Sequence, residues 1–132
     1  MLTMHKIIYA EITVHALKGL PDESCGLLAG SGRAVTRFYP LTNTDQSREH
    51  FSMDPAEQFA AVKDMRANGL TLLAIYHSHP ASPSRPSEED IRLAHTPGVS
   101  HVIVSMAEPG NTILKSFLIE DGDVTEEAVE LV

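Results

Sequence analysis

Apolar residues recur along this chain with periods that change from helical to strand-like and back. The first helical set is Ile8, Ile12, Ala16 and Leu20. This spacing predicts a helix over residues 3–19, although the β-branched residues in that stretch weaken the prediction. A second helix is predicted with Asp54 as its N-cap and Pro55 as its first residue, running to Asn68 and stopping at Gly69.

Shorter apolar runs predict strands between these helices. The expected strands cover residues 25–30, 34–41, 70–79, 100–106 and 113–120. A third helix is expected to begin at Ser87 and to end before Pro97, whereas residues 42–50 are polar and irregular. Asp121-Gly122 favours a hairpin turn, followed by a final strand through Val132. Interleaved strands and helices around one core predict a single α/β (α+β) domain over residues 1–132.

Composition narrows the classes of partner. The chain has 132 residues, 42% of them hydrophobic and 21% charged, as in an ordinary globular protein. A net charge of -8 argues against nucleic acid, which requires a basic patch. We find no signal peptide and no apolar run long enough for a bilayer, so no membrane partner is expected. A single cysteine excludes an internal disulfide and fits a cytoplasmic location.

The strongest chemical signal is His77-Ser78-His79-Pro80, with Asp90 following ten residues after Pro80. Two histidines at i and i+2 of a strand project from the same face, and Pro80 ends the strand because it has no N–H to donate. Imidazole and carboxylate are zinc ligands, and three of them leave a fourth position open for water, as in catalytic zinc sites. His77, His79 and Asp90 are therefore the predicted zinc ligands.

Each part of this pattern also has an ordinary explanation. A histidine at a strand end is more often solvated or hydrogen-bonded, and Ser87-x-x-Asp90 is close to a helix capping box. The conjunction favours metal binding, because prolines 80, 83 and 86 stiffen the loop that returns Asp90 to the histidine pair.

These residues resemble the motif of the JAMM/MPN+ (JAB domain) family of zinc metallopeptidases, which is an upstream Glu, then His-x-His-Pro, six residues and Ser-x-x-Asp. The later part is matched at every motif position. Residues 23–30 resemble the family's Glu-x-Cys-Gly-Leu-Leu-x-Gly segment and make Glu23 the match; neighbouring Asp22 is interpreted as a solvated loop acid. The resemblance covers nearly the whole chain and is strongest to the compact prokaryotic type.

The resemblance implies a mixed sheet flanked by helices, the MPN fold, with a cytidine-deaminase-like architecture. It also implies a hydrolase that cuts peptide or isopeptide bonds with zinc at His77, His79 and Asp90. Glu23 would be the general base and Ser87 a hydrogen-bond donor to the oxyanion. The sequence alone would not select Glu23 among the acids, and we assign no chemistry to Ser78.

Compact members of this family are linked to ubiquitin-like sulfur carriers of the ThiS/MoaD type, which implies cleavage just after a terminal Gly-Gly. A tail without side chains can lie extended in a narrow cleft close to a metal. We expect the cleft walls to come from residues 44–51 and from the loop at residues 108–112.

Two alternatives remain. The first is a non-catalytic MPN-type interaction module, against which the intact ligand set argues. The second is a thiol hydrolase that pairs Cys25 with one of the seven histidines, although Cys25 before Gly-Leu-Leu is typical of a small buried hydrophobe. The other histidines show no ligand spacing and are expected to be exposed or hydrogen-bonded: His5, His15, His50, His95 and His101.

Overall fold

The computed structural model describes residues 1–132 and contains eight strands and three helices. The strands are β1 (Leu2–Met4), β2 (Cys25–Ser31), β3 (Ala34–Leu41), β4 (Thr71–His79), β5 (Ser100–Glu108), β6 (Asn111–Glu120), β7 (Asp123–Glu127) and β8 (Val129–Leu131). The helices are α1 (Lys6–Gly19), α2 (Pro55–Ala67) and α3 (Glu88–Arg92). All strands join one sheet in the order β7-β6-β5-β4-β2-β3-β1-β8. β4 runs parallel to β5, and β1 runs parallel to both β3 and β8; the other pairs are antiparallel. The expected mixed sheet with flanking helices is confirmed.

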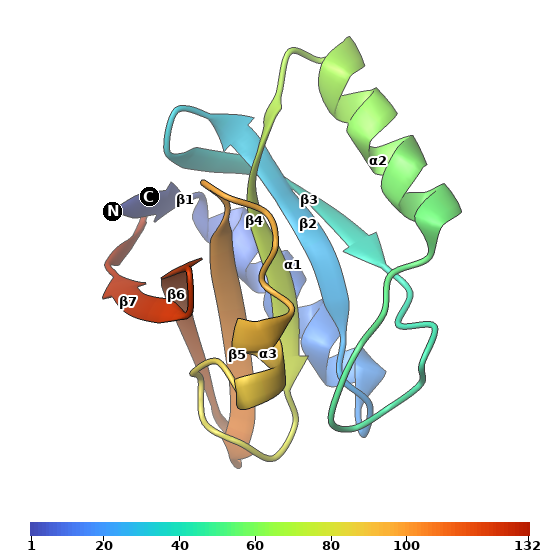
Figure 1. The fold of residues 1–132 in the computed structure, drawn as a ribbon, viewed down its shortest axis with the longest axis vertical. Helices are drawn as coiled ribbons and strands as arrows, with labels where there is room; N and C mark the ends of the chain where they lie inside the picture. Colours follow the sequence, from blue (N-terminus) through green and yellow to red (C-terminus); the bar gives the residue numbers. More distant parts are fainter.

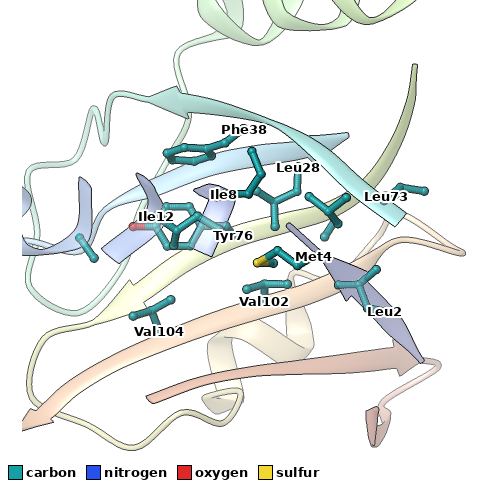
Figure 2. Packing of buried hydrophobic residues seen from close by; sticks show 13 residues of the cluster. Leu2, Met4, Ile8, Ile12, Leu28, Phe38, Leu73, Tyr76, Val102 and Val104 are labelled. Atoms are coloured by element: carbon teal, nitrogen blue, oxygen red, sulfur yellow. The ribbon is translucent and has the colours of Figure 1, made fainter. Parts of the chain in front are cut away.

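The helices cover both faces of the sheet (Figure 1). On one face, Ile8 and Ile12 of α1 pack against side chains such as Tyr76 and Val102, within a cluster of 13 buried hydrophobic residues (Figure 2). Helix α1 buries the stripe of Ile8, Ile12 and Ala16 against this face of the sheet, whereas its other large aliphatic residues stay exposed. No helix is long and apolar enough to cross a membrane.

The opposite face carries the two other helices. Met65 of α2 packs with Leu27 of β2, and Ile91 of α3 lies against a small cluster around Ile103 of β5. Because successive strand residues point to opposite faces, Tyr76 points towards α1 whereas His77 and His79 point to the side of α2 and α3. This alternation places the histidine pair on the face that α3 covers.

The start of helix α1 differs from the expected one, and helix α3 ends before Pro97 as expected but is short. Helix α1 begins at Lys6 and not at residue 3, because Leu2 and Met4 are fully buried in strand β1 between β3 and β8. Helix α3 ends at Arg92, well before Pro97, and none of its residues is fully buried. A short helix with so little buried surface gains little from packing, so nothing extends it.

The expected final strand is divided into β7 and β8, with only Ala128 between them. These strands occupy opposite ends of the sheet order, so the sheet must curl until its two edges meet at Ala128. The Ala128 carbonyl accepts a hydrogen bond from Leu2 N at 2.9 Å, which joins the edge to β1.

A buried carboxylate stabilises this junction. Glu127 Oε2 pairs with Arg33 Nη2 at 2.7 Å, and Glu127 Oε1 accepts hydrogen bonds from Ser100 Oγ at 2.5 Å and Ser116 Oγ at 2.7 Å. Burial alone would raise the pKa of Glu127, but the two serine hydroxyls and the Arg33 charge outweigh it and lower the pKa. We call these four residues the seam, since they join three strands and the β2–β3 turn where the sheet closes.

Candidate active site

Strand β4 and helix α3 bring the three expected metal ligands together. His77 Nε2 and His79 Nε2 lie 3.1 Å apart, and each lies 3.2 Å from Asp90 Oδ2. Both histidines are at most 4% exposed. Of the His, Cys, Asp and Glu residues, only this group of three gathers its ligand atoms in the manner of a metal site.

The three atoms form a triangle whose size fits a zinc ion. Ligand atoms at about 2.0–2.1 Å from a tetrahedral zinc lie about 3.3–3.4 Å from one another. The observed separations of 3.1–3.2 Å are close to that value. Two imidazoles and one carboxylate also suit zinc chemically, so the residues fit the ion that the motif predicts.

Neighbouring groups orient both rings. His79 Nδ1 lies 2.8 Å from the Pro83 carbonyl oxygen, which can only accept, so Nδ1 carries the proton and Nε2 presents its lone pair. The His77 ring stacks on Phe51 at a centroid distance of 4.8 Å. The rings are therefore held in a ligand geometry by the protein itself.

The three groups also shift one another's pKa values. Burial lowers the pKa of His77, and Asp90 only partly offsets it. Burial alone would lower the pKa of His79 too, but the Asp90 and Pro83 hydrogen bonds raise it. Burial alone would raise the pKa of Asp90, yet the two rings hold it well below its usual range. Asp90 is therefore an anion, which is the form that binds a cation.

Ser87 occupies the N-cap of α3, as the capping-box pattern predicts. Its hydroxyl oxygen accepts from Asp90 N at 3.0 Å, and Asp90 Oδ2 accepts from Ser87 N at 2.9 Å. The same carboxylate oxygen thus faces the histidine pair and caps the helix. The hydroxyl proton of Ser87 has no acceptor within the protein and stays free for another partner.

Glu23 lies next to this cluster as a buried carboxylate without a partner. It is 4% exposed, and its Oε1 makes no hydrogen bond. Burial raises the pKa of Glu23 to about 8, with the His79 charge opposing the shift and the Asp90 charge adding to it. A carboxyl group that exchanges its proton near neutral pH is typical of a general acid–base.

Two neighbouring segments hold the backbone at Glu23. The amide of Glu23 donates to the Ser47 carbonyl at 2.8 Å, and its carbonyl accepts from Asn43 Nδ2 at 2.9 Å. On the other side, the amide of Ser24 donates to Ser78 Oγ at 2.7 Å, which ties the segment to β4. Glu23 is therefore held between the 43–52 loop and the strand that carries both histidines.

Two hollows flank the cluster. The first, which we call the apolar hollow, has a volume of about 210 Å³ and is bounded by His77, Phe51, Met53 and Leu93 among others. The second, the polar hollow, has a volume of about 240 Å³. Its walls are Glu23, Arg48, Glu49, His79, Ala81, Ser82 and Ser87. The candidate metal site lies between an apolar and a polar space.

Residues 48–51 of the segment that we expected to form a cleft wall contribute to these hollows. The other expected wall, residues 108–112, contributes to neither. Glu108 lines a separate hollow together with Pro83 and Arg85. That part of the expectation is wrong, because the loop after β5 lies beyond the 80–87 loop and not against the histidines.

Sequence reasoning missed three residues of the site. Ser78 lies between the histidines and points to the opposite face, where it binds Ser24. Asn43 anchors Glu23. His101 is buried, lines the apolar hollow, and has an Nε2 atom without a partner. Ser78 could have been found from strand alternation and its place between the ligands; the other two are brought in by tertiary contacts alone.

Cys25 does not have the environment of a nucleophile. It is fully buried on β2 in a hydrophobic cluster with Leu27 and Leu41. Burial raises the pKa of its thiol to about 12, so the reactive thiolate is disfavoured at neutral pH. This environment argues against the thiol hydrolase.

A His-His-Asp triangle at a strand end, beside a buried carboxyl group and between two hollows, is the arrangement expected of a metal-dependent hydrolase. The chain belongs to the prokaryotic JAB family: the family model described as prokaryotic homologs of the JAB domain matches residues 5–119. It is accordingly a hydrolase of the JAMM peptidase class.

Three similar proteins illustrate the relationship. The chain is 37% identical over 123 residues to the CysO-cysteine peptidase of Mycobacterium tuberculosis, covering 92% of this chain and 84% of that one. It is 39% identical over 113 residues to a Thermus thermophilus protein named "Probable TtuB-protein conjugate cleaving protease", covering 85% and 72%. A Desulfitobacterium hafniense protein of known solution structure is 53% identical, with a TM-score of 0.91 over 100% of this chain and 93% of that chain.

Proposed function

We propose that the protein is a zinc-dependent peptidase that hydrolyses the bond after the C-terminal Gly-Gly of a small ubiquitin-like or sulfur-carrier protein. The observation that carries this proposal is the triangle of His77, His79 and Asp90 beside the unpartnered carboxylate of Glu23. The names of the Mycobacterium and Thermus relatives support this substrate class. Each name describes a protease or peptidase that acts on a conjugate or adduct of a named protein, CysO or TtuB. We infer a cytoplasmic location, with which the single unpaired Cys25 is compatible.

His77, His79 and Asp90 would hold the zinc ion through Nε2, Nε2 and Oδ2. When bound, zinc supplies a Lewis acid that activates a water molecule and polarises the scissile carbonyl. The protein contributes the fixed geometry. Pro83 sets the tautomer of His79, Phe51 holds the His77 ring, and the Ser87 amide orients Asp90.

Glu23 moves the protons. Its carboxylate accepts a proton from the attacking water and gives it to the amine nitrogen as the C–N bond breaks and the new C–O bond forms. The surroundings favour this role: with its pKa raised to about 8, the buried Glu23 carboxylate is a stronger base than an exposed one, and it holds the proton near neutral pH until the amine takes it.

Ser87 stabilises the charge that develops on the carbonyl oxygen. Its oxygen is occupied by the Asp90 amide, but its proton is free and lies at the edge of the polar hollow. A donor that is already fixed by a helix cap needs no reorganisation when the oxyanion forms, and such a donor typically lowers a barrier by about 3 kcal/mol.

The shape of the site suits a tail that ends in Gly-Gly. The amine must leave on the side of Glu23, which places the leaving group in the polar hollow and the carrier tail in the apolar hollow. Glycines have no side chains to clash with Phe51 or Leu93, so the tail can approach the histidines closely.

The test is hydrolysis of defined conjugates by zinc-loaded protein. Carrier–Gly-Gly joined to an amino acid and to a lysine side chain would be incubated with the protein and analysed by mass spectrometry. We expect products cut directly after Gly-Gly, and none with the zinc-loaded Glu23→Gln variant. Hydrolysis of unrelated peptides in the absence of any cleavage after Gly-Gly would contradict the proposed substrate.

A further inference from the structure

The polar hollow is lined by one permanently charged cation, Arg48, that is not paired with any other group of the protein. Arg48 lines this hollow together with Glu23, His79 and Ser87, yet it forms no hydrogen bond and no ion pair. Arg33 and Arg37, in contrast, are each paired with a carboxylate. An unpaired guanidinium at the wall of a catalytic hollow is available for an anionic ligand.

The backbone at Arg48 is fixed relative to Glu23. The preceding residue, Ser47, accepts the Glu23 amide through its carbonyl at 2.8 Å. The Ser47 hydroxyl also accepts from the amide of Glu49 at 3.1 Å, which closes a tight turn around Arg48. The segment that positions the acid–base therefore presents the cation as well.

Asn43 makes this turn rigid. Its Nδ2 donates to the His50 carbonyl at 3.1 Å, and its Oδ1 accepts from Asp45 N at 3.1 Å and from Ser52 N at 3.2 Å. A single side chain thus joins both ends of the loop. A turn crosslinked in this way loses little backbone conformational entropy when its side chain binds a ligand.

The leaving group must lie in this hollow, because Glu23 protonates the departing nitrogen. In an α-amino acid, the carboxyl carbon is two bonds from that nitrogen, about 2.5 Å away. A free carboxylate would then lie beside the reaction centre on the side where Arg48 is. The nitrogen of a lysine side chain has only methylene groups at this distance, and a longer peptide has a neutral amide there.

We propose that Arg48 binds the α-carboxylate of the leaving group, so that the preferred substrate is a carrier whose Gly-Gly is joined to a single free amino acid. The inference rests on the proposed function and narrows it. In the step, water oxygen bonds to the glycine carbonyl carbon, the C–N bond breaks, and the proton held by Glu23 moves to the nitrogen. The amino acid leaves with its carboxylate still paired to Arg48.

Other walls of the hollow agree with a small leaving group. Ala81 and Ser82 have short side chains and leave room for the side chain of the amino acid. Glu49 is the opposing charge, and its carboxylate would repel a ligand carboxylate that did not lie against Arg48. Arg48 therefore attracts the ligand carboxylate, and Glu49 restricts where that carboxylate can lie.

The experiment compares three carrier adducts: Gly-Gly-alanine with a free carboxylate, the same adduct with a C-terminal carboxamide, and Gly-Gly joined to a lysine side chain. We expect zinc-loaded wild-type protein to prefer the free acid by about tenfold or more in kcat/KM. Arg48→Gln is expected to lose about tenfold on the acid and to change the carboxamide by less than about twofold. Arg48→Lys should restore part of the preference, since it keeps the charge without the planar fork.

The matched control is Arg85→Gln. Arg85 is also an arginine of a loop near the site, but it lines the separate hollow. It should leave the acid-to-amide ratio unchanged, with zinc content and far-ultraviolet circular dichroism verifying that all variants are folded and loaded.

Equal cleavage of the acid and the carboxamide by wild-type protein would overturn the role of Arg48 and leave the proposed function intact. An equal loss on both adducts in Arg48→Gln would overturn it as well. If zinc-loaded wild-type protein cleaves none of the three adducts, the proposed function itself fails and the inference fails with it.

Discussion

Ser78 and Ser24 form a reciprocal pair of hydrogen bonds. The Ser24 amide donates to Ser78 Oγ at 2.7 Å, and the Ser78 amide donates to the Ser24 carbonyl at 2.9 Å. Ser78 lies between the two histidines, and Ser24 directly follows Glu23. The pair therefore couples the position of Glu23, the proposed acid–base, to the position of the candidate ligands. The serine of the His-Ser-His motif thus has a structural use that its residue type alone does not reveal.

We expect Ser78→Ala to lower kcat by about tenfold while zinc binding stays near the wild-type level. The loss follows because the Glu23 segment is no longer tied to β4, and small misplacements of catalytic groups are costly. The free energy of unfolding should fall by about 1 kcal/mol, since the buried Ser24 amide loses its partner. Steady-state kinetics, metal analysis and denaturant titration measure the three quantities.

Ser116→Ala is the matched control, because Ser116 is an equally buried serine that hydrogen-bonds Glu127 far from the site. The Ser116→Ala variant should lower the free energy of unfolding by a similar amount without slowing turnover. Equal kinetic effects in both variants would mean that Ser78 acts only through stability.

Glu23→Gln should abolish turnover, with a loss of about 10²-fold or more, and keep bound zinc. In the metal-free protein it should also raise the midpoint of thermal unfolding by about 3 °C or more at pH 8. Because the folded-state pKa of Glu23 is raised from 4.5 to about 8, its charged form opposes folding increasingly as pH rises through that interval. Calorimetry from pH 5 to pH 8 should show the difference growing; a constant difference would contradict the raised pKa.

Replacing both histidines, as His77→Ala with His79→Ala, should remove stoichiometric zinc and the stabilisation that zinc gives to the folded state. Elemental analysis and thermal unfolding with and without a chelator measure these effects. His95→Ala, which changes an exposed histidine outside both hollows, should behave as wild type. Zinc retained by the double variant would place the metal elsewhere. If the protein bound the carrier equally well with and without a chelator and hydrolysed nothing, the non-catalytic interaction module would be favoured.

Cys25→Ala should retain full activity per zinc bound and lose about 1 kcal/mol of stability, because the thiol packs in a hydrophobic cluster and has a pKa raised to about 12. Activity of the folded variant, measured beside a thiol-alkylation assay of the wild-type protein, tests this. Loss of activity without unfolding would revive the thiol hydrolase.

Glu127→Gln should lower the free energy of unfolding by about 1–2 kcal/mol at neutral pH, because the seam loses an ion pair and charge-assisted hydrogen bonds. The folded-state pKa of Glu127 lies below the ordinary value of 4.5, so its stabilisation is present above that pH and is lost as pH falls through the lower value. Unfolding midpoints of both proteins should therefore converge in acid. Curves that stay parallel from neutral pH down to pH 3 would contradict this prediction.

Local signals predicted most elements: apolar runs indicated β4 and β5, and the N-cap Asp54 with Pro55 indicated α2. The period of the apolar residues gave the wrong element at β1. These three residues directly precede a helical pattern, and they form a strand only because they pair with strands distant in sequence. The clustering of the candidate ligands could be predicted from spacing, since His77, His79 and Asp90 lie on adjoining local elements. Glu23 could not be predicted from spacing, because it approaches them only through the pairing of β2 with β4, in which Cys25 lies opposite His77. For Glu23 the family motif supplied what local rules lack.

The meeting of the sheet edges at Ala128 also constrains the order in which the chain can fold. Strand β1 lies between β3 and β8, so the first strand of this chain is paired on both sides only after residues 129–131 have docked. Contacts between residues so distant in sequence carry the largest loop-closure cost and form late. The β2–β4–β5 centre, with the histidine pair, can assemble before that closure. Thermal fluctuations should accordingly open the β1–β8 pairing first, so amide hydrogens there should exchange with solvent faster than those beside the histidine pair.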